Sequence, residues 1–212
     1  MIKAILFDFD GTLVDSKQAF LSAYNQMAAH HHFHNLTLES FDRLRRCTMK
    51  ERCAALSIPM HKLPFLIGEL TRLYRQSLMQ IHLMDGVMDM INQLSKSGFD
   101  LAIISSNEEK NIRMFLQSHE TDCISTIMCS RKLFAKDRLM RKYLKKHQLK
   151  AEEALYIGDE ERDIRASRKS GISVIWAKWG FDSIENVRDA KPDYIADHPN
   201  DVMQIVQSLQ SD

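Results

Sequence analysis

The sequence predicts an α/β protein, a doubly wound parallel sheet that carries an inserted all-α domain. Short apolar runs alternate along the chain with segments of helical periodicity, which is typical of βαβ units with helices on both faces of a parallel sheet. The first two runs are separated by about ninety residues, far more than a βα crossover requires. We expect strands at Ala4–Phe7, Leu101–Ile104, Ile124–Met128, Ala154–Ile157, Val174–Trp176 and, more weakly marked, Tyr194–Ile195.

The composition is that of a globular protein with one sizeable core and a smaller accessory unit. The chain has 212 residues, 44% hydrophobic, and its 29 Lys and Arg nearly balance 28 Asp and Glu. No overall electric field therefore favours nucleic acid or a membrane surface, and neither is expected as a partner. No leader with a cleavage site precedes the first run, and no apolar run approaches about eighteen residues. We expect a cytoplasmic monomer or homodimer.

The cysteines argue for a reducing environment. Cys47 and Cys53 are six residues apart, as are Cys123 and Cys129, and this spacing matches neither a zinc knuckle nor a redox motif. Reduced, mostly buried thiols are expected.

An acidic motif, Asp8-Phe9-Asp10-Gly11-Thr12, ends the first apolar run. Because side chains on a strand alternate faces, Asp8 and Asp10 should point the same way. Burying two like charges is costly unless a cation or hydrogen bonds compensate, so a divalent metal is the simplest explanation. Gly11 can adopt a positive φ and bring N–H groups near an anion, and Thr12 adds a hydroxyl donor. The alternative is an Asp-Gly turn after an edge strand.

This motif resembles the first motif of the haloacid dehalogenase-like hydrolases, in the helical-cap phosphatase branch that includes phosphoglycolate phosphatase and β-phosphoglucomutase relatives. The resemblance implies a Rossmann-like core in which Asp8 is a nucleophile that forms an aspartyl-phosphate. It implies that Asp10 is a general acid and base. Dehalogenases proper lack the second Asp, so Asp10 argues for phosphate chemistry. Gly11 and Thr12 are then candidate substrate-binding residues.

The inserted segment is helical in pattern and poor in turns. Residues 16–82 are expected to form a helical cap domain, hinged near Ser16 and Leu83–Gly86, and residues 1–15 and 83–212 the catalytic core. In the family that the chain resembles, such a cap closes over the active site. Arg43 and Arg46 belong to a local basic patch that could meet an anionic substrate, although a solvated helix face is an equal alternative.

The second strand ends in Ser105-Ser106-Asn107. A hydroxyl at this strand end could hold a phosphate oxygen. Ser106 and Glu109 fit a helix capping box, which leaves Ser105 as the catalytic candidate. The family's Ser/Thr-Asn pair also aligns its hydroxyl with Ser105, so Ser106 stands where Asn is usual. Asn107 could supply the missing amide, and both Ser106 and Asn107 are candidate substrate-binding residues.

A lysine opens the amphipathic segment Arg138–His147. Taken alone, Lys136 would be a solvated surface residue. Its place after the third strand and about twenty residues before a Gly-Asp motif resembles the family's third motif, in which Lys neutralises nucleophile and phosphate. Lys136 is therefore a catalytic candidate, with Lys132 as the fallback.

The fourth motif is Gly158-Asp159-Glu160-Glu161-Arg162-Asp163, which matches the family's metal-binding Gly-Asp-x-x-x-Asp. If a helix starts at residues 158–160, Asp159 and Asp163 lie on one face, a like-charge pair that a cation would stabilise. With Asp8 and Asp10 they are the candidate metal ligands. Ligands that are all oxygen suit Mg²⁺. A helix start enriched in acids explains Glu160 and Glu161.

Two weaker signals carry structural expectations. His30, His31, His32 and His34 could bind a metal, but neighbouring helix residues face different directions, so a solvated helix end is expected. Trp179-Gly180-Phe181 resembles the family's closing segment, and we expect core packing and a turn there.

The expected function is that of a Mg²⁺-dependent phosphatase acting on a small phosphorylated metabolite, with phosphoglycolate as the first substrate. One alternative is a sugar-phosphate mutase of the same family, which keeps the phosphoenzyme and excludes water. Another is a non-catalytic phosphate-sensing module, against which the intact acidic motifs argue. The sequence has no Walker P-loop and no dinucleotide-binding glycine motif.

Overall fold

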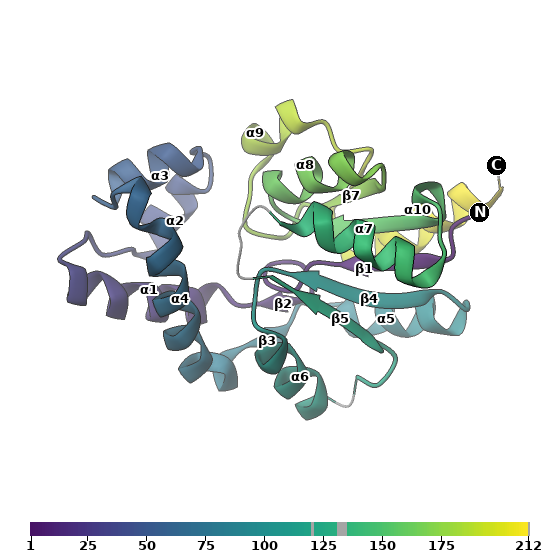
Figure 1. Cartoon of the computed structure of the whole chain (residues 1–212), viewed down its shortest axis with the longest axis horizontal. Coiled ribbons are helices and arrows are strands. Elements are labelled where there is room, and N and C mark those ends of the chain that lie inside the picture. Colours follow the sequence, from purple (N-terminus) through teal and green to yellow (C-terminus); the bar gives the residue numbers. More distant parts are fainter. Residues whose placement is uncertain (120, 131–134, 212) are drawn as a thin grey trace.

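The computed structural model describes residues 1–119, 121–130 and 135–211, and it confirms the predicted fold class (Figure 1). Six parallel strands form the sheet in the order β5-β4-β1-β6-β7-β8. All six predicted strands are present, and no strand end differs from the prediction by more than two residues. They are β1 (Ala4–Phe7), β4 (Asp100–Ser105), β5 (Thr126–Cys129), β6 (Ala154–Gly158), β7 (Ser173–Ala177) and β8 (Tyr194–Ala196).

The strand order reverses at β1. This strand pairs in parallel with β4 on one side and β6 on the other. The chain runs from β1 to β4 and β5 on one side and then returns to β6 on the other. In open α/β sheets, ligands bind beyond the carboxyl ends of the strands at such a switch point. The residues that follow β1, β4 and β6 are therefore brought together at one edge.

Helices cover both faces of the sheet (Figure 1). Alternate residues of β1 face opposite layers of helices. Ile5 and Phe7 belong to one apolar cluster, and Ala4 and Leu6 belong to the other. The first layer holds α5 (Val87–Lys96), α6 (Glu109–Ser118) and α10 (Pro199–Ser211). The second holds α7 (Lys136–His147), α8 (Glu161–Ser170) and α9 (Ile184–Val187). Helix α7 begins two residues earlier than predicted, so Lys136 lies in its first turn.

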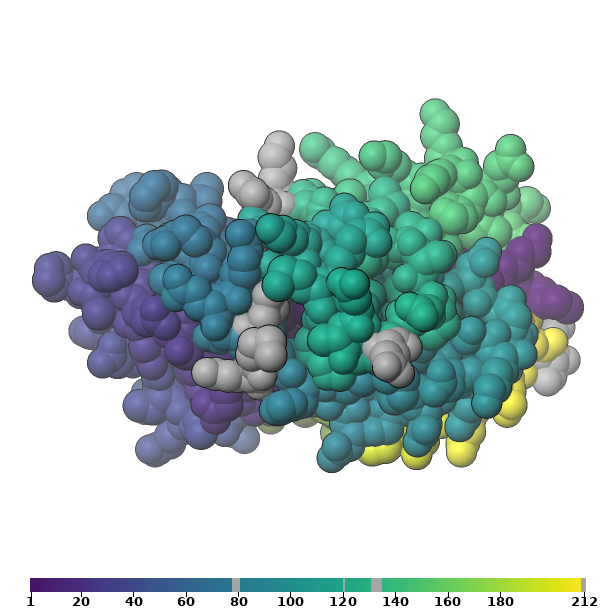
Figure 2. Space-filling view, turned by 90° about the horizontal axis from the view of Figure 1, so that it is seen from below, coloured from purple at the N-terminus to yellow at the C-terminus, as the bar shows by residue number. Residues whose placement is uncertain are grey.

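The segment between β1 and α5 is mainly helical, as predicted, and forms a lobe beside the sheet (Figures 1 and 2). Its helices are α1 (Lys17–His31), α2 (Leu38–Leu44), α3 (Met49–Ala55) and α4 (Leu63–Tyr74). Two short antiparallel strands, β2 (Val14–Asp15) and β3 (His82–Leu83), pair where the chain enters and leaves this insert. The sequence did not indicate that ribbon, because two-residue strands carry no periodicity.

Polar contacts attach α2 and α3 to the loop that follows β7. The guanidinium of Arg45 donates to the carbonyls of Gly180 and Asp182, at 3.0 and 2.8 Å. Arg52 forms an ion pair of 2.5 Å with the carboxylate of Asp182, which is 4% exposed. The same carboxylate accepts a hydrogen bond from the backbone N–H of Glu161 at the start of α8. Asp182 thus joins the insert, the loop and the core.

The histidines lie at a largely solvated helix end, as expected, because His30 and His34 are exposed and His31 is half-buried. His30 and His31 also contact the carboxylate of Glu69 on α4, at 3.1 and 2.7 Å. The two rings can share one partner because a carboxylate has two oxygens. His32, which ends the helix in a left-handed conformation, is exposed as expected.

Two further sequence expectations can be compared with the described structure. The four cysteines are free, but only Cys53 is fully buried and the others are half-buried. Lys132 lies outside the described residues. Within the described part of the chain, no helix combines the length and the apolar character needed to cross a bilayer.

We expect Asp182→Ala to lower the free energy of unfolding by about 1–3 kcal/mol, because it leaves the Arg52 guanidinium and a helix-start N–H without their acceptor. Urea unfolding measures the change. The matched control is Asp42→Ala, whose carboxylate is 57% exposed and 3.7 Å from Lys17, and it should change the free energy by less than about 0.5 kcal/mol. Equal effects of the two substitutions would contradict the role of Asp182.

Candidate active site

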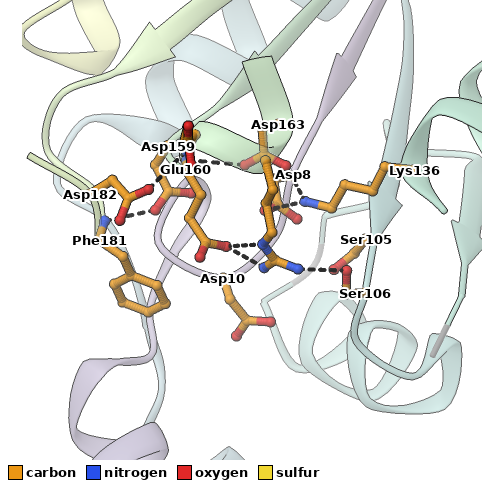
Figure 3. A network of polar contacts seen from close by, with 12 residues as sticks. Asp8, Asp10, Ser105, Ser106, Lys136, Asp159, Glu160, Asp163, Phe181 and Asp182 are labelled. Carbon is orange, nitrogen blue, oxygen red and sulfur yellow. Dashed lines mark hydrogen bonds and ion pairs between the residues drawn. The ribbon is translucent and has the colours of Figure 1, made fainter. Parts of the chain in front are cut away.

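A cluster of buried charges lies at the carboxyl ends of β1 and β6 (Figure 3). Asp8 directly follows β1 and is 2% exposed. One of its carboxylate oxygens accepts from the backbone N–H of Phe9, and the other lies 2.5 Å from Nζ of Lys136. The same Nζ lies 2.5 Å from Oδ1 of Asp163. One ammonium group therefore holds two carboxylates that would otherwise repel each other.

The protonation of this cluster follows from its surroundings. Burial raises the pKa of Asp8 to about 7, because Lys136 offsets the loss of water only in part and Asp163 repels the charge. Burial also disfavours the charge of Lys136, but the two carboxylates raise its pKa above the usual value. Burial disfavours the charge of Asp163 as well, yet Lys136 and Arg162 lower its pKa. We conclude that Lys136 stays protonated and that Asp163 stays ionised.

Asp159 is tightly enclosed, and no cation contacts it within the part of the chain that the structure describes. Its side chain accepts hydrogen bonds from Oγ1 of Thr12 and the backbone N–H of Phe181, both at 2.7 Å. A Cβ added at Gly11 or Gly180 would come within 2.4 or 2.1 Å of Asp159 atoms, so only glycine fits at either position. Burial raises the pKa of Asp159 well above its usual value, and the neighbouring carboxylates Glu160, Asp8 and Asp163 add to the effect.

The predicted helical pairing of Asp159 with Asp163 is wrong. Helix α8 begins at Glu161, after Glu160 as its N-cap, so Asp159 precedes the helix and does not share a face with Asp163. The carboxylate of Asp163 instead accepts from the backbone N–H of Glu160 at 3.1 Å, as part of a capping box. Asp163 therefore stabilises the start of α8 and orients Lys136.

The donor set fits a hard divalent cation. Asp8, Glu160 and Asp163 can each bring one ligand oxygen within 4.8 Å of the others, a grouping that adds Glu160 to the predicted ligands and leaves out Asp10 and Asp159. Asp159 lies beside this group and is a buried carboxyl that meets no cation among the described residues. Buried carboxylates without compensation favour a bound cation, and all-oxygen donors suit Mg²⁺.

Ser106 is not the helix cap that its sequence predicted. Helix α6 begins at Glu109 with Glu108 as the N-cap, two residues later than a cap at Ser106 requires. The hydroxyl of Ser106 instead accepts from Nη1 of Arg162 at 2.9 Å, while the Oγ of Ser105 is buried and accepts from the backbone N–H of Asn107. Both hydroxyls lie next to the acidic cluster (Figure 3).

Arg162 is a second buried cation that sequence reasoning did not select. It pairs with Glu160 through Nε and Nη2. Burial disfavours its charge, but Glu160, Asp163 and Asp8 raise its pKa further above the usual value. In the sequence, Arg162 lies within the motif of residues 158–163, beside the predicted metal ligands. No spacing rule for such motifs assigned a role to this side chain.

Asp10 is held by residues from both lobes. Its Oδ1 accepts from the hydroxyl of Tyr74 at 2.5 Å, and its Oδ2 accepts from Nδ2 of Asn107 at 2.8 Å. Tyr74 ends α4 of the insert, whereas Asn107 follows β4 and is itself held by Asn111 at 3.0 Å. Burial and the adjacent Asp10 raise the pKa of Tyr74 above its usual value, so its hydroxyl stays a donor. The sequence carries no local signal for Tyr74, because it lies 64 residues from Asp10.

A cavity of about 290 Å³ extends from this site into the insert. Asp10, Ser106, Asn107 and Arg162 line its core end. Of the insert's arginines, Arg45 and Arg52 line it as well. The structure places the two predicted arginines elsewhere, because Arg43 and Arg46 are exposed and neither lines the cavity.

The segment Trp179-Gly180-Phe181 does more than make the expected turn. Nε1 of Trp179 donates to the carbonyl of Thr12 at 3.0 Å, and the ring of Phe181 packs on Phe41 of the insert, with ring centroids 5.8 Å apart. Nε1 of Trp176 in β7 donates to the carbonyl of Asp159 at 2.9 Å. These contacts fix the loops that carry Thr12 and Asp159.

Comparison with known proteins gives consistent matches over nearly the whole chain. Residues 5–177 match the family model of the haloacid dehalogenase-like hydrolases. A phosphoglycolate phosphatase of Synechococcus elongatus is 28% identical, over 98% of this chain and 99% of that protein. The pyrophosphatase PpaX of Bacillus mycoides is 21% identical over 98% of both chains. A haloacid dehalogenase-like hydrolase of Streptococcus pneumoniae has the same fold, with a TM-score of 0.82 and 24% identity over 97% of this chain and 98% of that one.

We expect Mg²⁺ to raise the midpoint of thermal unfolding by about 5–10 °C at about 100 times its Kd, because the cation compensates buried carboxylates of the folded state alone. Asp159→Asn should reduce this rise strongly and leave the metal-free midpoint unchanged or higher, since it removes an uncompensated buried charge. Differential scanning fluorimetry measures both midpoints. Asp197→Asn, at a carboxylate that is 69% exposed, is the control. An undiminished rise in Asp159→Asn would exclude Asp159 from the metal site.

Proposed function

The chain belongs to the haloacid dehalogenase-like hydrolases and is a phosphatase, and from that premise we propose that it hydrolyses a small phosphomonoester through an aspartyl-phosphate on Asp8. The observation that carries this proposal is the buried carboxylate of Asp8, held 2.5 Å from Lys136 at the switch point of the sheet. A carboxylate in that position can act as a nucleophile once a cation offsets the charge of the incoming phosphate.

The proposed reaction has two steps. In the first, an oxygen of Asp8 attacks phosphorus in line, the bond to the leaving oxygen breaks, and Asp10 gives that oxygen its proton. In the second, Asp10 takes a proton from a water molecule, whose oxygen attacks phosphorus and releases inorganic phosphate and the free carboxylate of Asp8. Tyr74 and Asn107 support this role, because their hydrogen bonds hold both oxygens of Asp10 in place.

The phosphoryl oxygens need positive charge and hydrogen-bond donors. Lys136 and Arg162 are cations beside Asp8, and Ser105 and Ser106 offer hydroxyl groups, whereas the hydroxyl of Thr12 donates to Asp159. The backbone around Gly11 adds N–H donors. We propose that Asp8, Asp10, Asp159 and Asp163, joined by Glu160, hold Mg²⁺, which when bound would neutralise phosphoryl oxygens.

Phosphoglycolate is the first substrate to test, because the relative from Synechococcus elongatus bears that name. The pyrophosphatase name of another relative shows that the leaving group varies among similar chains. We further propose that residues 16–82 form a lid on the core of residues 1–15 and 83–212. The ribbon of β2 and β3 at its base and the cavity between the lobes support that division.

We expect Asp8→Asn to fold and to lose turnover entirely, since an amide cannot form the acyl-phosphate. The assay is release of inorganic phosphate from phosphoglycolate and a panel of phosphorylated metabolites with Mg²⁺, and EDTA should abolish it. After acid quenching, the wild-type protein should carry a hydroxylamine-sensitive phosphate that the variant lacks. Asp100→Asn, at the opposite end of β4, is the control and should retain activity. Turnover by Asp8→Asn would refute the nucleophile assignment.

We expect Tyr74→Phe to lower kcat by about tenfold or more with a smaller change in KM, because hydrogen bonds to charged groups are worth about 1.5–3 kcal/mol and this one orients Asp10. Steady-state kinetics separates the two constants. Tyr24→Phe is the matched control, since the Tyr24 hydroxyl donates to the carbonyl of His34, away from Asp10. If both variants lose kcat equally, the effect arises from the insert's packing and not from Asp10.

A further inference from the structure

The cavity next to Asp10 has mostly apolar walls, which is unusual for a site that binds charged metabolites. Aromatic and aliphatic side chains from all four helices of the insert line most of it, among them Phe20, Met27, Leu44, Met49, Leu66 and Leu70. Its volume of about 290 Å³ is close to the lower limit of about 300 Å³ for small-molecule pockets, which are mostly apolar with a few polar groups.

The fold itself keeps this space open. Helices α1 and α4 pack closely on each other. Helices α2 and α3 are held to the core from the other side, by Arg45 on the carbonyls of Gly180 and Asp182 and by Arg52 on the carboxylate of Asp182. These polar contacts hold α2 and α3 away from α1 and α4. An apolar space of this size holds water poorly and favours an apolar occupant.

The position of Asp10 says which part of a substrate enters the cavity. Asp10 lines the cavity and is also the acid in the proposed reaction. A phosphoester with its phosphorus beside Asp8 must place its leaving oxygen next to Asp10, so the rest of the leaving alcohol continues into the apolar space. This step rests on the proposed function.

We infer that the preferred substrates are phosphomonoesters of alkyl or aryl alcohols whose apolar part is larger than the glycolate group. The carboxylate of glycolate would stay at the polar core end of the cavity, near Asn107 and Arg162, and glycolate is too short to fill the apolar part. Arg52 is paired with Asp182, and Arg45 uses Nη2 on two carbonyls. Nε of Arg45 is buried without a partner among the described residues, which leaves a donor for one acceptor atom on the alcohol.

The test is a series of n-alkyl phosphates from ethyl to hexyl, compared with phosphoglycolate at saturating Mg²⁺. These alcohols are similar as leaving groups, so differences report on binding of the chain. We expect kcat/KM to rise about threefold to fourfold for each added methylene that is buried. Phosphoglycolate should rank below butyl phosphate. A flat series, or phosphoglycolate as the best substrate, would overturn the inference and leave the proposed phosphatase function intact.

A cavity-filling variant tests the location. Leu70→Trp should lower kcat/KM for hexyl phosphate at least tenfold and bring the ratio of hexyl to ethyl phosphate close to one. Ile67→Trp, at a second half-buried lining residue, replaces it if the first variant does not fold. Leu38→Trp, at a residue that is 46% exposed and outside the lining, should leave the ratio unchanged. An unchanged ratio in a folded Leu70→Trp would refute the assignment.

Binding of alkylphosphonates, which are not hydrolysed, separates the two proposals. Isothermal titration with methyl- to hexylphosphonate should give affinities that rise with chain length. If no ester is hydrolysed but this rise is present, the cavity assignment stands and the proposed function fails. If esters are hydrolysed and phosphonate affinity does not depend on chain length, the proposed function stands and the cavity assignment fails.

Discussion

The ion cluster of Asp8, Lys136 and Asp163 is the interaction on which the rest of the site depends. It links the end of β1, the first turn of α7 and the first turn of α8 through one buried ammonium group, with both contacts at 2.5 Å. Removing one partner of a buried pair typically costs about 3–5 kcal/mol, because a charge is left without compensation. The cluster therefore aligns three segments that are far apart in the sequence, and it holds the proposed nucleophile beside a cation.

The acidic residues around this cluster differ in how their charge is compensated. Asp163 is held ionised by Lys136 and Arg162, which lower its pKa. Asp159, equally buried, receives hydrogen bonds from Thr12 and Phe181 and meets no cation among the described residues, and its pKa is raised. Asp163 therefore has cationic partners within the protein, whereas the charge of Asp159 requires a further cation. Gly11 and Gly180 lie so close to Asp159 that a side chain at either position would collide with it.

Two of the contacts between the insert and the core involve residues that line the cavity. Tyr74 donates to Asp10, and Arg52 pairs with Asp182. The first contact joins the insert to the proposed acid and base, and the second holds the apolar cavity open. Movement of the insert would therefore alter the orientation of Asp10 and the shape of the leaving-group space together.

The sequence by itself determined the strands and the acidic motifs that follow them. Apolar runs bounded by turns identify buried parallel strands, and the carboxyl ends of parallel strands meet at one edge, so Asp8 and Asp159 could be grouped without coordinates. Lys136 was added to this group only through its resemblance to the family's third motif. Local sequence patterns predicted helix starts and caps less reliably, because more than one local structure fits the same residues. The start of α8 was placed too early, and Ser106 was given a capping role that Arg162 overrides. Only the tertiary structure decided the contacts of Tyr74, Arg52 and Asp182, and the shape of the cavity. Those features join residues that no periodicity relates, because they depend on how the insert is placed against the core.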